Sequence, residues 1–181
     1  MSTPDKASQL CVGCGMCCDG VLYKQAKVAA GEEDRMAASG LELVEEEGRT
    51  FFRQPCPHSS EGRCMIYETR FRICRTFECA LLHRVNAGEL GLAEAQEKVS
   101  VAQALLATVV TTDPDARAAR DRIGVRARLA EEMLGDDGGK RGRIARRLLN
   151  LIALDSFLEE WFRLPNERVA ADDQLMDSSS K

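Results

Sequence analysis

The cysteines of this chain are confined to one part of it, and that confinement limits what the chain can fold into. The sequence has 181 residues and eight cysteines, and none of the eight lies beyond residue 79. They are Cys11, Cys14, Cys17, Cys18, Cys56, Cys64, Cys74 and Cys79. Eight cysteines placed at random would seldom leave more than half of a chain empty. We therefore treat the eight cysteines as one local site.

The cysteines of this site either form disulfide bonds or bind metal. A disulfide framework needs an oxidising compartment. The first six residues, MSTPDK, lack the apolar core of a signal peptide. The longest apolar stretch, residues 104–110, is far shorter than the roughly 18 residues of a membrane span. We therefore expect a cytoplasmic protein, in which closely spaced cysteines bind metal more often than they form structural disulfides.

The spacing of the first four cysteines indicates how they share metal. Two residues separate Cys11 from Cys14, and two separate Cys14 from Cys17, so three thiolates can converge on one ion. Neighbouring side chains of an extended chain point in opposite directions, so we expect Cys18 to serve a second metal or a bridge. Eight thiolates suffice for two tetrahedral zinc sites or for one or two iron–sulfur clusters, and the spacing leaves the pairing open. We interpret His58 as a loop residue, because the cysteines already satisfy two sites.

The pattern of apolar residues divides the chain into a cysteine module and a helical portion. Residues 41–53 predict two short strands around a Glu-Gly-Arg turn. After the last cysteine, apolar residues recur with the helical period. We predict an α+β fold, mainly α, with a small metal-stapled N-terminal module over residues 1–88 that carries a short β-hairpin. A helical region over residues 89–166 and a disordered tail over residues 167–181 complete the predicted organisation.

Three apolar stripes define the predicted helices of the C-terminal half, and we expect each stripe to face the core. The first consists of Leu92, Ala95, Val99, Ala102, Leu106 and Val109. The second consists of Ala119, Ile123, Ala127, Ala130 and Leu134. The third consists of Ile144, Leu148, Leu151, Leu158 and Phe162. Asp113 and Pro114 predict a helix start between the first two stripes, with Asp113 as the N-cap.

Charge and aromatic content limit the partners of the chain. Lys and Arg number 25 against 29 Asp and Glu, a net charge of -4, which argues against binding nucleic acid through bulk positive charge. Residues 117–147 contain ten basic and five acidic residues, but no aromatic side chain that would stack on bases. We therefore expect neither a nucleic-acid nor a membrane partner, and we consider the helical region a surface for a protein partner.

Three cysteine segments resemble those of a known family. The segments CVGCGMCCDG, PCPH and CMIYETRFRICRTFEC, within residues 11–79, are similar to the YkgJ-type family of zinc- or iron-chelating domains with a CxxCxxCC signature. One departure is visible, because Phe71 follows Arg70 where that family commonly has proline. The resemblance implies metal or iron–sulfur binding without a defined reaction. A similar cluster occurs in flagellin lysine methylases, which implies that such a module can support a modification enzyme.

Three functions are compatible with these features. The first is a cytosolic protein whose eight cysteines chelate zinc or hold an iron–sulfur cluster, with no assigned reaction. The second is a redox or protein-modification enzyme that uses an iron–sulfur cluster, although no glycine-rich methyl-donor site follows a predicted strand. The third is a nucleic-acid-binding module. We favour the first, and the sequence identifies no catalytic residue.

Overall fold

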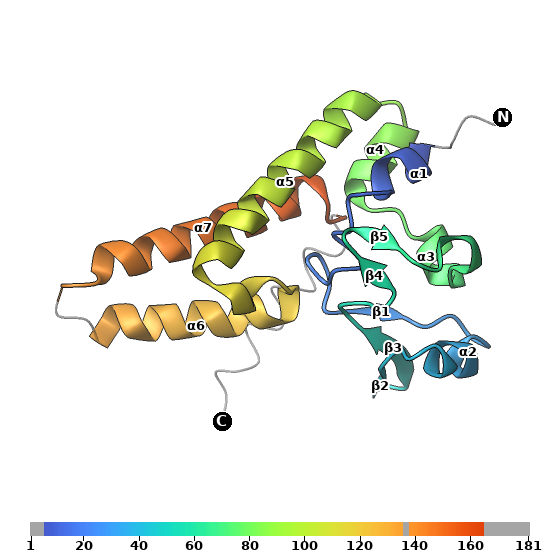
Figure 1. The fold of residues 1–181 in the computed structure, drawn as a ribbon, viewed down its shortest axis with the longest axis horizontal. Coiled ribbons are helices and arrows are strands. Elements are labelled where there is room, and N and C mark those ends of the chain that lie inside the picture. The colour runs from blue at the N-terminus through green and yellow to red at the C-terminus, as the bar shows by residue number, and fades with distance from the viewer. Residues whose placement is uncertain (1–5, 136–137, 165–181) are drawn as a thin grey trace.

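The chain folds into a set of short elements beside a set of long helices (Figure 1). The computed structural model describes residues 6–135 and 138–164. The short elements form the cysteine module, residues 6–79: α1 (Lys6–Cys11), β1 (Gln25–Lys27), α2 (Glu33–Ala38), β2 (Leu43–Glu46), β3 (Arg49–Arg53), β4 (Ser59–Ser60), β5 (Arg63–Cys64), the 3-10 helix η1 (Tyr67–Thr69) and α3 (Arg72–Thr76). The helical half, residues 80–164, contains α4 (Ala80–Asn86), α5 (Leu92–Thr112), the 3-10 helix η2 (Pro114–Ala116), α6 (Ala119–Gly135) and α7 (Arg141–Trp161). The predicted α+β fold, mainly α, is confirmed.

A three-stranded antiparallel sheet forms the middle of the cysteine module. The predicted hairpin is present as β2 and β3, joined at Glu47 and Gly48, which both have positive φ as a type I′ turn requires. β1 adds a third strand on the other side of β3, so the strand order is β1-β3-β2. The sequence pattern did not predict β1, because this strand has three residues and no apolar alternation. A second, two-residue hairpin, β4 and β5, turns at Glu61 and Gly62.

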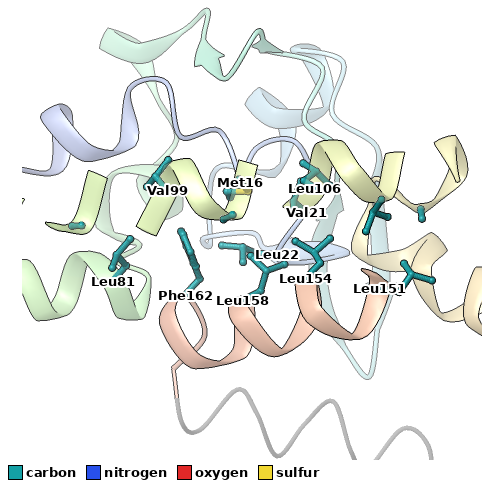
Figure 2. Close-up of a cluster of buried hydrophobic side chains, with 14 of the residues drawn as sticks. Met16, Val21, Leu22, Leu81, Val99, Leu106, Leu151, Leu154, Leu158 and Phe162 are labelled. Atoms are coloured by element: carbon teal, nitrogen blue, oxygen red, sulfur yellow. The ribbon is translucent and has the colours of Figure 1, made fainter. Parts of the chain in front are cut away.

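Two hydrophobic cores lie behind these elements. The small core belongs to the sheet and its flanking helices, and its buried members are Val28, Met36, Leu41, Phe52 and Phe71. The large core lies between α5 and α7, where the first and third predicted stripes pack with Leu92 and Leu148 at the margin. Figure 2 shows that Met16, Val21 and Leu22, from the chain after the first cysteines, lie in this large core. The helical half therefore packs directly on the cysteine-bearing chain.

The predicted orientation of α6 is wrong. Ile123 and Leu134 were expected in the core, but they are 60% and 86% exposed, and the alanines of that stripe at positions 127 and 130 are exposed too. The buried face instead carries Val125, Leu129 and the guanidinium of Arg122. Arg122 donates to Asp155 of α7, and this buried ion pair fixes the rotation of the helix. A prediction based on apolar residues alone places every arginine at the surface, so it could not identify the face of α6 that contains the buried Arg122.

The predicted helix start at Pro114 is present, but Asp113 has a different role from the expected one. Pro114 begins η2, whereas α6 begins five residues later, and the Asp113 side chain makes no capping hydrogen bond. Asp113 is buried and pairs with Arg147 of α7, whose Nε lies 2.9 Å from Oδ2. This pair holds η2 against α7.

Some expectations lie beyond what the structure tests. The predicted tail over residues 167–181 lies outside the described residues, and the division into separate domains at residue 88 stays a prediction. Within the described part of the chain, no helix combines the length and apolarity needed to cross a membrane.

Candidate metal centre

The first cysteines lie on a loop of tight turns, residues 11–22. The amide of Cys14 donates to the carbonyl of Cys11 at 3.1 Å, and the amide of Gly20 donates to the carbonyl of Cys17 at 3.2 Å. Gly15 has a φ of +67°, and a Cβ atom at this position would lie 2.7 Å from the Cα of Gly62. Only glycine tolerates both the backbone conformation and this contact. The loop therefore packs backbone to backbone on the β4–β5 turn, which brings the two cysteine segments together.

The helical half holds this loop from the other side. Four of its donors bind loop carbonyls at donor–acceptor distances between 2.5 and 2.9 Å: Ala119 N to Gly20 O, Gln103 Nε2 to Gly13 O, Arg122 Nη2 to Val21 O and Arg163 Nη2 to Leu22 O. Gly20, Val21 and Leu22 are buried, and their carbonyls need such partners, because an unpaired buried carbonyl costs about 1–3 kcal/mol; Gly13 is exposed. The loop is therefore a preformed part of the fold. The four anchoring residues could not be recognised in the sequence, because each lies more than 60 positions along the chain from the cysteines of the loop.

All eight predicted ligand residues meet at one cavity. This cavity has a volume of about 510 Å³, and every cysteine of the chain contributes to its wall. None of the eight forms a disulfide bond in the described structure. Aromatic side chains, among them Tyr23, Phe52 and Phe71, and aliphatic ones such as Leu41 and Ile73 form much of the rest of the wall. The cavity is thus rich in sulfur and poor in polar groups.

Electrostatic effects between the thiols define a first set of four cysteines. The pKa of Cys14 is raised to about 12, mainly by burial; a hydrogen bond from the Met16 backbone opposes the shift, and nearby Cys79 and Cys11 add to it. Burial also raises the pKa of Cys17 well above its usual value, and Cys79 is the strongest of the thiols that add to this shift. Cys14, Cys11 and the adjacent Cys18 contribute to it as well. We call Cys11, Cys14, Cys17 and Cys79 the first set.

The other four cysteines interact with one another in the same way. The pKa of Cys18 is raised to about 12, mainly by burial and then by Cys56, Cys74 and Cys64, in that order. Burial raises the pKa of Cys74 to about 11, with Cys56 and Cys64 again adding to the shift and Arg70 opposing it. We call Cys18, Cys56, Cys64 and Cys74 the second set. Adjacent cysteines 17 and 18 therefore lie in different sets, which is what alternation of neighbouring side chains predicts.

The two sets lie against different cores. Cys14, Cys17 and Cys79 of the first set pack on the large core between α5 and α7. Cys56 and Cys74 of the second set pack on the small core of the sheet. Each set thus belongs to its own structural surroundings, although both open into the same cavity.

The wall of the cavity carries one polar group that sequence reasoning missed. Gln54 is 6% exposed and lines the cavity, and its Oε1 has no hydrogen-bond partner within the described structure. Its position between an arginine and a proline offers no pattern that would mark it as functional. Buried polar groups are normally satisfied, so this amide oxygen, which can only accept, is suited to a bound cation or hydrogen-bond donor. The donor set therefore fits a metal or cluster.

The thiols are grouped but are not closed around an ion. Across the described residues, no three His, Cys, Asp or Glu side chains already surround a common ion position. The raised pKa values keep the buried thiols of Cys14, Cys17, Cys18 and Cys74 protonated at neutral pH. A metal would have to displace these protons, since the thiolate is the form that coordinates.

Comparison with known proteins agrees with this arrangement. The family model named CxxCxxCC, described as "Putative zinc- or iron-chelating domain", matches residues 10–102, which is more than half of the chain. The matched region contains all eight cysteines and ends within α5. No curated protein and no solved structure gives a significant match. The chain is therefore a member of the CxxCxxCC family of zinc- or iron-chelating domains.

Proposed function

We propose that this protein binds two metal centres, each held by one set of four cysteine thiolates. The observation that carries the proposal is that all eight cysteines line one cavity. The division into two sets is our inference from which thiols raise one another's pKa and from the core on which each set packs. Four thiolates complete a tetrahedral zinc site or hold one iron–sulfur cluster. The proposal places the protein in the cytoplasm, where a reducing environment keeps the thiols available.

The surroundings of the cysteines suit a negatively charged thiolate centre. Four thiolates around a divalent ion leave a net charge of -2, which a nearby cation stabilises. Arg70 already lowers the pKa of Cys74, so its guanidinium lies where it would oppose that charge in the second set. Burial raises the pKa of Cys56, and the nearby backbone amides of His58 and Ser59 oppose that shift; the Ser59 amide donates to the carbonyl of Cys56 at 3.0 Å. Such donors around the ligands tune both affinity and reduction potential.

The size of the cavity favours iron–sulfur clusters over bare zinc ions. In a four-cysteine zinc site each sulfur lies about 2.3 Å from the ion, so the ligands enclose it and leave no space between them. A cavity of about 510 Å³ exceeds what two enclosed ions occupy. The iron and inorganic sulfide atoms of clusters would fill such a space. The aromatic wall would keep water from them, and exposure to water is one of the factors that set a cluster's potential.

Metal analysis of protein purified without oxygen tests this assignment. We expect brown protein that contains iron and acid-labile sulfide and whose visible absorption bleaches with dithionite. Colourless protein with two zinc ions per chain would retain the two sets and overturn the iron assignment. Protein that binds neither metal after reconstitution with iron and sulfide, or with zinc, would overturn the whole proposal.

A further inference from the structure

The pair of helices α6 and α7 carries apolar side chains that no part of the described structure covers. Ile123 and Leu134 of α6 are 60% and 86% exposed, and Leu149 and Ile152 of α7 are 63% and 52% exposed. On α6 the exposed alanines at positions 127 and 130 fill the spacing between the two large residues. Positions 123, 127, 130 and 134 form one stripe along a helix. We call Ile123, Ala127, Ala130, Leu134, Leu149 and Ile152 the hairpin face.

The two stripes lie on the same side of the helix pair. On α6, Ile123 directly follows the buried Arg122, and on α7, Ile152 directly follows the buried Leu151. One residue is a rotation of about 100°, in the same sense on both helices. Because α6 and α7 run in opposite directions and face each other (Figure 1), rotations of the same sense turn both stripes to one side. The two stripes of the hairpin face therefore lie on one side of the helix pair.

Basic residues outnumber acidic ones in the segment that carries the hairpin face, and five of the basic ones are already paired with carboxylates: Arg117, Arg122, Arg126, Arg128 and Arg147. Residues 117–147 contain ten Arg or Lys and five Asp or Glu. Arg141 begins α7, Arg143 and Arg146 are exposed within its first two turns, and no acidic residue lies in its first turn. Cations at a helix N-terminus meet the positive end of the helix dipole, which favours an anionic partner.

We propose that the hairpin face docks an amphipathic α-helix with an acidic polar side, supplied by a partner protein. An apolar surface that presents anchors from parallel stripes is suited to a helix laid along it. A second copy of this chain would bring the same basic residues together, so charge opposes self-association. Helices that lie on membranes carry Trp, Phe or Leu on their apolar side, and of these three the hairpin face has leucine alone, so membrane binding is made an outcome of the test.

This inference is independent of the metal assignment. Both helices lie beyond residue 102, outside the region that the CxxCxxCC family model matches. The hairpin face therefore lies outside the matched cysteine domain. A failure of metal binding would leave the docking test unaffected.

The test uses the full-length protein and two synthetic peptides. One peptide is a 21-residue amphipathic helix with leucine and alanine on one side and glutamate on the other, and the second has lysine in place of glutamate. We expect fluorescence anisotropy to show binding of the glutamate peptide at low salt, weakening as salt increases. Changing both Leu149→Gln and Ile152→Gln should weaken this binding at least tenfold. Val101→Gln, at a 43% exposed position of α5, is the matched control and should leave it unchanged.

Four results would overturn the proposal. The first is absence of binding by the glutamate peptide, and the second is equal binding of the lysine peptide. The third is a dimer in sedimentation velocity that the double variant abolishes, since it would make a second copy the occupant. The fourth is binding to phosphatidylserine-containing vesicles that the double variant abolishes, since it would make a membrane the occupant. Circular dichroism of the double variant should match the wild type, because both positions are exposed.

Discussion

The first cysteine set lies against a core of twenty described buried residues, whereas the second lies against a core of five. The loop of the first set is also anchored by four hydrogen bonds from the helical half. The strands and helices around the second set are at most six residues long, from β1 to α3. Small cores of this kind seldom support a fold without a metal or a covalent link. The metal centre of the first set would therefore bind to a loop that the fold already holds in place. The centre of the second set would instead stabilise the short strands and helices around it.

Removal of metal should have the largest effect, and it should affect the two regions unequally. Structural metal sites in small domains contribute on the order of 10 kcal/mol or more, so the part that depends on metal unfolds without it. We expect amide hydrogen exchange of the anaerobically chelated protein to show loss of protection over residues 24–76. α5 and α7 should keep their protection, because the large core does not depend on metal. Uniform loss, or no loss, would remove the distinction between the two regions.

Arg122 connects the helical half to the first set, and its removal should weaken that connection. Its guanidinium is 2% exposed and donates to Val21 O, Arg117 O and Asp155. Arg122→Met leaves these acceptors without a buried donor, which costs about 3–5 kcal/mol of unfolding free energy. Urea denaturation measures this loss. The control is Arg126→Met, because Arg126 also pairs with Asp155 but is more exposed; we expect about 1 kcal/mol or less.

The contact between Gly15 and Gly62 joins the two cysteine segments, and a methyl group should disrupt it. Gly15→Ala combines a strained positive φ with a backbone contact of 2.7 Å, so we expect a loss on the order of 3 kcal/mol. Gly13→Ala has a similar φ, +87°, but no atom within 4 Å of the added Cβ, so it isolates the backbone strain at about 1 kcal/mol. Thermal unfolding of both variants measures the difference. Equal losses would show that the close contact does not matter.

The buried thiols of the first set, which pack on the large core, should make that core less stable in alkali once metal is removed. The pKa of Cys14 is about 12 and that of Cys17 is also raised, whereas an unfolded thiol titrates near 9.0. Above pH 9 the unfolded chain therefore loses protons that the folded chain retains, so the unfolding free energy falls as the pH rises. Each such thiol contributes at most about 1.4 kcal/mol per pH unit.

Urea denaturation of the chelated, reduced protein between pH 7.5 and 10.5 measures this slope. The Cys14→Ala variant is the matched control, because it removes one of the two thiols and should make the slope shallower. A slope that is the same in both proteins would exclude Cys14 as a source of the pH dependence.

Much of the fold follows from local sequence patterns. The turn at Glu47 and Gly48 marks the β2–β3 hairpin, and the stripes of α5 and α7 face the core because their apolar residues keep the helical period. The orientation of α6 could not be predicted in this way. Its buried face includes Arg122, whose partners Val21 and Asp155 are distant in sequence and become neighbours only in the folded chain.

The candidate site, too, could be predicted from the sequence in some respects and not in others. The number and clustering of the cysteines identify a thiolate site, and the adjacency of Cys17 and Cys18 indicates that they diverge. The assignment of Cys79 to the first set and of Cys74 to the second does not follow from spacing, although only four residues separate them. It depends on how α3 and α4 place the chain on the two cores. Gln54 likewise acquires its position from tertiary packing alone.

The division into two sets of four is tested most directly by counting metal in paired cysteine variants. Cys17→Ser combined with Cys79→Ser should remove one centre and leave half of the wild-type metal, because both residues belong to the first set. Cys18→Ser combined with Cys74→Ser should remove the other half. Cys17→Ser combined with Cys18→Ser should remove all of it, although these residues are adjacent. If instead that last pair leaves half of the metal, or a pair from one set removes all of it, the division is contradicted.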